Sequence, residues 1–157
     1  MKFFRDCWGV KIIRILEPRD CEMIMGYADT IPVKERIPEF KKIGVLRESI
    51  FSTKLVAVGE FGDDEKICKL FAIYVPISSP RLLCLTVAYT ETDEDFIKQS
   101  ITIMEGIFEN KYTKIKAYIM GDDDAQKKVA ILEAIGFEKE AEARNDAVRI
   151  STYSYFY

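Results

Sequence analysis

Histidine is absent from the 157 residues of this sequence. Without an imidazole, the chain cannot form a Ser-His-Asp or Cys-His nucleophile system, nor a metal site with histidine ligands. If the chain is an enzyme, its proton transfers must use carboxylates, tyrosine, cysteine, lysine or water held by the backbone.

Cysteine is scarce and scattered, and no two of its four copies form a C-x-x-C pair. This spacing excludes a zinc ribbon, and a disulfide framework is not typical of an unsecreted chain of this length. The acidic runs DDEK (63–66) and GDDDA (121–125) lack the alternating oxygen ligands of a calcium loop, so we predict no metal site. We predict buried thiols at Cys7, Cys21, Cys68 and Cys84.

Long apolar runs, a cleavable leader and a basic charge excess are lacking as well. No stretch approaches the ~20 apolar residues that a membrane span needs, and Arg5 and Asp6 interrupt the apolar N-terminus. The net charge of −3 gives no basic footprint for nucleic acid, and 48% hydrophobic with 31% charged residues is typical of a globular protein. We expect a cytoplasmic protein with a single domain over residues 1–157 and with no nucleic-acid or membrane partner.

The chain does contain a regular alternation of strand-like and helix-like patterns. We predict helices at 21–29, with Asp20 as the N-cap, and at 39–50, 93–109 and 122–135. The almost wholly apolar run at 82–89 indicates a central strand covered on both faces. The order β-α-α-β-β-β-α-β-α-β-β predicts an α/β (α+β) fold, with a mixed, mostly antiparallel central sheet and helices on both faces. The predicted strands are 10–16, 54–60, 67–75, 82–89, 114–120, 137–144 and 147–157.

The stretch ILEAIGFEKE (131–140) turns a helix into a strand at one glycine, Gly136. Glycine can end the helix in a left-handed conformation, and Phe137 can then enter the core at the start of the strand. Together with the element order, the run AILEAIGFEKEAEAR (130–144) resembles the GNAT N-acetyltransferase superfamily. The resemblance covers nearly the whole chain in element order, and it is carried in residues mainly by 129–144.

This resemblance implies a GNAT-like fold that uses acetyl-CoA as a substrate. In the family, the fourth strand splays from the fifth and pairs with the pantetheine arm of coenzyme A, a role that falls here to Leu85, Thr86 and Val87. The family's next loop binds the pyrophosphate with glycine-flanked amides at a helix N-terminus. That loop is TDEDFI (92–97) in this chain, and it has neither the glycines nor the Arg or Gln of the family.

The acidic loop leaves two interpretations open. Thr92 and Asp95 fit a capping box, in which a solvated helix start satisfies its own amides. Alternatively, the loop is a disguised coenzyme site. Its acids must then be offset, because each carboxylate near a pyrophosphate costs about 1–4 kcal/mol. The candidates for this offset are Lys98, Lys127 and Lys128.

Candidate catalytic residues are few, because leucine replaces the tyrosine that the family usually places four residues before the Gly-Phe pair. Tyr89 at the splay, or Tyr153 or Tyr155 on the last strand, can supply a phenol to the leaving thiolate. Glu60 or Glu91 can act as a base, directly or through water. Tyrosines at such positions more often serve strand packing, and a carboxylate at a strand end is more often simply solvated.

Two functions follow from the sequence. The first is transfer of an acetyl group from coenzyme A to a small-molecule or peptide amine, and the second is a GNAT-fold module for interaction or ligand sensing that has lost coenzyme binding. The acidic loop favours the second. A third interpretation is an unrelated α+β fold with the same order of elements. The final STYSYFY (151–157) places tyrosines on one face, either as core or as a patch suited to a partner or a homodimer.

Overall fold

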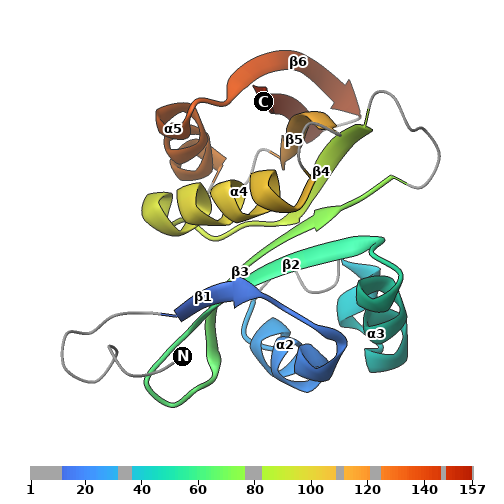
Figure 1. Cartoon of the computed structure of the whole chain (residues 1–157). Coiled ribbons are helices and arrows are strands. Elements are labelled where there is room, and N and C mark those ends of the chain that lie inside the picture. The colour runs from blue at the N-terminus through green and yellow to red at the C-terminus, as the bar shows by residue number, and fades with distance from the viewer. Residues whose placement is uncertain are drawn as a thin grey trace.

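A seven-stranded sheet organises the part of the chain that the computed structural model describes, residues 12–31, 37–76, 83–108, 112–120, 125–145 and 148–156. The strand order is β1-β2-β3-β4-β5-β7-β6 (Figure 1). β4 and β5 are parallel, whereas the other neighbouring pairs are antiparallel, so the predicted mixed sheet is confirmed. The strands are β1 (Ile12–Ile15), β2 (Leu55–Phe61), β3 (Ile67–Tyr74), β4 (Leu83–Tyr89), β5 (Tyr112–Met120), β6 (Glu138–Asn145) and β7 (Val148–Phe156).

Helices lie on both faces of this sheet, and the predicted order of elements is confirmed. Two single turns of 3-10 helix, η1 (Pro18–Asp20) and η3 (Pro38–Phe40), precede the first two α-helices. The helix predicted at 39–50 begins only at Ile43, because Lys42 is extended and separates it from η3. The predicted positions 10–11 and 122–124 lie outside the described residues. The α-helices are α2 (Cys21–Ala28), α3 (Ile43–Phe51), α4 (Glu94–Phe108) and α5 (Ala125–Ile135).

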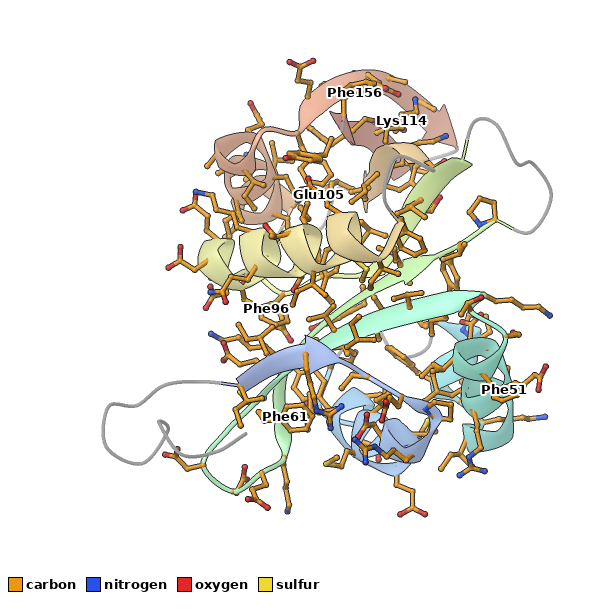
Figure 2. All side chains as sticks on the ribbon, in the orientation of Figure 1. Phe51, Phe61, Phe96, Glu105, Lys114 and Phe156 are labelled. Atoms are coloured by element: carbon orange, nitrogen blue, oxygen red, sulfur yellow. The ribbon has the colours of Figure 1, made fainter. Side chains whose placement is uncertain are left out.

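Each face of the sheet has its own apolar core. α4 and α5 cover one face, where Phe96 of α4 lies between the helix and the sheet (Figures 1 and 2). α2 and α3 cover the other face, and their Ile24 and Leu46 pack on the opposite side of the same strands. Side chains alternate along a strand, so β2, which is covered on both faces, is buried at all of its residues.

β4 differs from β2 although it occupies the centre of the sheet. Among the described side chains of this strand, Leu85 is fully buried but Thr86, Val87, Ala88 and Tyr89 are only partly buried. The prediction that 82–89 is covered on both faces is therefore wrong for its second half. The reason lies in the pairing of β4 with β5, which is described with the candidate site.

The corner between α5 and β6 is a glycine C-cap, as predicted. The amide of Gly136 donates to the carbonyl oxygen of Glu133 at 3.1 Å, and the amide of Phe137 donates to that of Leu132 at 2.9 Å. This is the hydrogen-bond pattern of a Schellman motif, and Gly136 has the positive φ of 121° that it requires. Phe137 is 2% exposed and packs in the core with its ring centroid 5.5 Å from that of Tyr155.

Replacing Gly136 with alanine is expected to destabilise the fold by about 1–2 kcal/mol, because an L-residue is strained at this φ. A Cβ there also lies 3.4 Å from the Tyr155 ring. Urea unfolding measures the change. Gly106→Ala in α4 is the matched control, since nothing lies within 4 Å of its Cβ, and we expect it to stabilise the helix by up to about 1 kcal/mol. Equal effects of the two substitutions would contradict the assignment of the corner.

Asp20 occupies the N-cap position of α2, but its side chain does not cap the helix. Its carboxylate accepts two hydrogen bonds from the guanidinium of Arg14, at 2.8 and 2.9 Å, and one from the Glu17 amide at 2.7 Å. Burial opposes ionisation, yet the Arg14 and Glu17 hydrogen bonds hold the pKa of Asp20 below its ordinary value. The predicted cap is thus a partly buried ion pair, with the carboxylate of Asp20 buried, that joins β1 to η1.

Arg14→Met is expected to cost about 2 kcal/mol of unfolding free energy at pH 7, because it leaves the carboxylate of Asp20 buried without its cation. The cost should shrink progressively as the pH falls below ~4, where Asp20 protonates in the unfolded chain, towards the lower pKa that this carboxyl has in the fold. Urea unfolding of the variant and the wild type at pH 7 and again below pH ~4 checks this expectation. Arg19→Met is the control. Its 2.6 Å pair with Glu17 is exposed and is expected to contribute less than about 1 kcal/mol.

Two smaller predictions are corrected, for Cys68 and Asn145, and the alternative left open for the tyrosines of the last strand is decided. Cys21 is buried as predicted, but Cys68 is exposed. Cys7 lies outside the described residues, and so does the side chain of Cys84. Tyr153 belongs to the core and Tyr155 is partly buried beside it, so these two tyrosines do not form an exposed patch. Asn145 is the last residue of β6 rather than part of a turn. In the described ranges, no helix combines the length and apolar character needed to cross a membrane.

Candidate active site

The parallel pairing of β4 with β5 stops half-way along both strands. The last paired residues are Thr86 on β4 and Lys116 on β5. Beyond them β4 stays paired with β3, where the register shifts around Ala88, and β5 stays paired with β7. Among the described pairings, none joins Val87–Tyr89 to β5. The two strands therefore separate, and the edge of β4 that faces β5 has backbone groups without a strand partner.

A cavity of about 640 Å³ lies at this separation. It reaches both faces of the sheet, because successive residues of one strand line it. Ala117 and Ile119 of β5 face the α4–α5 core, whereas Tyr118 between them points to the opposite face and is 51% exposed. The lining residues are Ile37, Tyr74, Thr86, Val87, Ala88, Tyr89, Thr90, Ala117, Tyr118, Ile119, Lys128, Ala141, Ala143, Ile150 and Thr152.

The lining is mainly apolar, with a few hydroxyl groups and one charge. Lys128 of α5 is the only charged residue among the described side chains that line the cavity. Tyr74 lies on the α2–α3 face and donates its hydroxyl to Glu39 at 2.8 Å. Burial, followed by this hydrogen bond, raises the pKa of Tyr74. The cavity thus combines apolar walls with a small set of polar groups, which is typical of a ligand site.

Tyr89 connects the cavity to a carboxylate beyond the end of β4. Oε1 of Glu91 accepts hydrogen bonds from the Tyr89 hydroxyl at 3.4 Å, from the Leu70 amide at 3.2 Å and from the Tyr27 hydroxyl of α2. Burial is the main reason that the pKa values of Tyr27 and Tyr89 are raised, and the charge of Glu91 adds to it. Both phenols therefore stay protonated at neutral pH and act as hydrogen-bond donors.

The start of α4 is capped by Asp93, not by Thr92. Oδ1 of Asp93 accepts a hydrogen bond from the Phe96 amide at 3.0 Å, which is the bond of an N-cap residue to the third residue of the helix. The capping box predicted from Thr92 and Asp95 is therefore wrong. α4 begins at Glu94, one residue later than predicted, and this displacement moves the capping role from Thr92 to Asp93.

Lys69 of β3 neutralises part of the acidic charge at this helix start. Its ammonium group forms an ion pair with the second oxygen of Asp93, and it lies 3.4 Å from a carboxylate oxygen of Glu60. The hydrogen bond to Asp93 is the main reason that the pKa of Lys69 is raised. The Glu60 side chain is 4% exposed, and the same oxygen also accepts a hydrogen bond from the Cys68 thiol at 3.4 Å.

Comparisons with known proteins bear on this geometry. No protein-family model matches the sequence, and no curated protein does. A GNAT-family acetyltransferase from Streptococcus pneumoniae superposes with a TM-score of 0.70 at 10% identity, over 94% of this chain and 100% of that chain. The chain has the GNAT fold. A probable acetyltransferase from Staphylococcus epidermidis gives a TM-score of 0.68 at 15% identity, over 94% and 99% of the two chains.

A third GNAT-fold structure has a more specific description. Ribosomal-protein-S5-alanine acetyltransferase from Vibrio fischeri superposes with a TM-score of 0.66 at 12% identity, over 93% of this chain and 92% of that chain. Identities this low concern the fold alone. The resemblance derived from the sequence is confirmed at the level of the GNAT fold.

The GNAT fold brings some of the predicted site residues to the cavity and leaves others elsewhere. Thr86, Val87 and Tyr89 line it, and so does Lys128, one of the three lysines predicted to offset the acidic loop. Leu85 and Tyr153 are buried in the core, at 0% and 6% exposure, and Glu60 is held by Lys69. The residues that lie at the start of α4, outside the cavity lining, are Thr92, Asp95 and Lys98.

Several residues of the site were not predicted from the sequence. Lys69 pairs directly across the β2–β3 hairpin with Glu60, so the register of the predicted hairpin could have identified this pair. Tyr27 reaches Glu91 across 64 residues of sequence, and no local pattern signals that contact. The same holds for the small cavity residues of β6 and β7, such as Ala141 and Thr152.

Asp93→Ala is expected to destabilise the protein by about 1–2 kcal/mol, because it removes the cap of α4 and the partner of Lys69. Asp95→Ala serves as the control, because Asp95 is exposed in the first turn and is expected to change stability by less than about 1 kcal/mol. Guanidinium unfolding measures both. If Asp95→Ala lost more unfolding free energy than Asp93→Ala, the result would support the capping box predicted from the sequence.

Proposed function

We propose that the chain transfers an acyl group from a thioester of pantetheine, as in acetyl-CoA, to an amine. The observation that carries this proposal is the cavity that passes between β4 and β5 and reaches both faces of the sheet. Two substrates can meet there from opposite sides, one along the edge of β4 and one from the side of Tyr74 and Tyr118. The GNAT-fold acetyltransferases among the solved structures support the same reaction class.

The reaction needs a neutral amine held against the thioester carbonyl. The amine nitrogen attacks the carbonyl carbon, a C–N bond forms and the C–S bond breaks. The electron pair of the broken bond leaves on the thiolate, and the nitrogen loses one proton. Holding both reactants in one cavity supplies much of the rate enhancement by positioning, without a covalent enzyme intermediate.

The edge of β4 fits the amide groups of a pantetheine arm. Val87–Tyr89 has no strand partner on the β5 side among the described pairings, so its backbone N–H and C=O groups on that side can pair with an extended amide chain. The β5 side of the opening contributes Ala117 and Ile119, which exclude water from the arm. The same edge can hold the acyl carbonyl close to Tyr89.

Tyr89 and Glu91 are suited to proton handling. Tyr89 lines the cavity and its hydroxyl remains protonated at neutral pH, so we expect it to donate a hydrogen bond to the carbonyl oxygen or to the departing sulfur. Glu91 lies behind it as a carboxylate that can accept the proton of the amine through water or through the phenol. Tyr153 and Glu60 have no such position relative to the cavity.

The start of α4 does not fit the diphosphate of coenzyme A. The Phe96 amide and Lys69, which are groups of the kind that bind an anion, are already used by the carboxylate of Asp93. No step of the reaction depends on this helix start. The same observation favours a second candidate function, a GNAT-fold module that binds a ligand or partner without catalysis.

Mass spectrometry of amine products separates the two candidates. The protein is incubated with acetyl-CoA or acetyl-pantetheine and a set of primary amines: a polyamine, a peptide with a free N-terminus and a lysine peptide. The proposal expects an acetylated amine, and Ala88→Phe, which fills the cavity, should abolish it. Ala134→Phe on the exposed side of α5 should leave it unchanged. If neither thioester is consumed and neither raises the stability of the fold, the second candidate, a module without catalysis, replaces the proposed reaction.

Tyr89→Phe is expected to lower kcat by about 10- to 100-fold with a small change in KM, because it removes the hydroxyl at the reacting atoms and keeps the ring. Tyr153→Phe is the comparison, since this buried tyrosine lies outside the cavity lining and should change kcat by about threefold or less. Steady-state kinetics on the amine found above measures both. An equal loss in the two variants would assign the effect to packing.

A further inference from the structure

The charge network at the start of α4 bears on which donor the cavity accepts. We propose that the chain recognises its acyl donor through the pantetheine arm, with at most one phosphate, because Asp93 and Lys69 occupy the place where the diphosphate of coenzyme A would bind. This inference rests on the proposed function and specifies its donor. The donor class is an acyl thioester of pantetheine or of 4′-phosphopantetheine.

Asp93 acts as an internal anion at the start of α4. A helix N-terminus attracts anions through its unpaired amides, and a nearby lysine strengthens that attraction. In this chain one carboxylate takes both groups, with Oδ1 on the Phe96 amide and Oδ2 on the Lys69 ammonium. A diphosphate at this position would have to displace a carboxylate that is covalently part of the loop.

Further negative charge surrounds Asp93 at the start of α4. Glu94 and Asp95 follow Asp93 in the first turn, and both are exposed. Lys69 is shared between Asp93 and the buried Glu60, and Lys98 lies 3.9 Å from Glu94. The described side chains at the helix start therefore carry more negative than positive charge, and two further negative charges would be repelled.

The described lining of the cavity is separate from the acidic helix start and differs from it in charge. None of the described residues 91–98 lines it, so a ligand can fill the cavity without touching the acidic helix start. Lys128 is the only charged residue in the described lining, and one ammonium group matches one phosphate rather than the diphosphate and additional phosphate of coenzyme A. The cavity and the helix start thus point to the same class of donor.

The test compares three donors on the folded protein by isothermal titration calorimetry: acetyl-pantetheine, acetyl-4′-phosphopantetheine and acetyl-CoA. For the wild-type chain we expect acetyl-CoA to bind no more than about threefold tighter than acetyl-4′-phosphopantetheine. A fourth titrant, a carrier protein that bears acetylated 4′-phosphopantetheine, distinguishes a carrier-held donor from a free one.

Asp93→Asn is the decisive variant, because asparagine still caps the helix but removes one of the two carboxylate charges that Lys69 neutralises. We expect its dissociation constant for acetyl-CoA to fall by about tenfold or more, with those of the two smaller thioesters unchanged. Glu94→Gln removes the same charge one residue away and leaves the bond to the Phe96 amide intact. We expect its affinity for acetyl-CoA to rise by less than about threefold. Asp93→Ser, which also caps, replaces the variant if Asp93→Asn does not fold.

Two results would overturn the inference while the proposed function stands. One is wild-type binding of acetyl-CoA about tenfold or more tighter than that of acetyl-4′-phosphopantetheine. The other is an equal gain in Asp93→Asn and Glu94→Gln, which would make the effect one of general charge. If none of the thioesters binds, the proposed function fails, and the inference fails with it.

Discussion

The separation of β4 from β5 is the constraint on which the rest of the molecule depends. Parallel strands that stayed paired to their ends would close the sheet, and no ligand could pass from one face to the other. Pairing stops at Thr86 and Lys116, and the two strands are then held only by their outer neighbours, β3 and β7. On one face, α4 packs on β1 and β3 and also against α5, which packs on β5, so these two helices connect the two halves of the sheet beside the opening (Figure 1).

The charge network at the start of α4 joins this helix to the sheet through side chains alone. Asp93 caps the helix and binds Lys69, and Lys69 in turn reaches Glu60 on the neighbouring strand. These contacts join α4 to the β2–β3 hairpin without any ligand. Carboxylates that would oppose a phosphate therefore contribute to the stability of the helix and of its docking on the sheet.

The sequence predicted those features that depend on neighbouring residues. Apolar periodicity identified α4 and the strands, and the run from Ile131 to Phe137 identified the glycine corner, because a helix end and its cap are local. The exact capping residue was missed because one position separates Thr92 from Asp93, and helix boundaries are less certain than helices. Part of the candidate site was predicted through the resemblance, namely the cavity residues Thr86, Val87 and Tyr89.

Long-range contacts of the site could not be read from the sequence. The bond from Tyr27 to Glu91 and the ion pair from Lys69 to Asp93 join residues 64 and 24 positions apart. Only the register of the folded sheet brings such residues together. The burial of Tyr153 could not be predicted for the same reason. The alternation of side chains along β7 does not say which face of the sheet a helix covers, and in the fold Tyr153 lies in the core that includes residues of α5.

The glycine corner has a mechanical consequence for the cavity. Lys128 lies eight residues before Gly136 on α5, about 12 Å along the helix axis at 1.5 Å per residue. At the far end of this span, the amides of Gly136 and Phe137 donate to the carbonyl oxygens of Glu133 and Leu132 and fix the end of α5 before β6. A tilt of α5 by about 10° at the Gly136 corner would move Lys128 by about 2 Å. That shift is enough to make or break a contact with one phosphate oxygen. The corner between α5 and β6 thus helps to set the position of Lys128, the only charged residue in the described lining of the cavity.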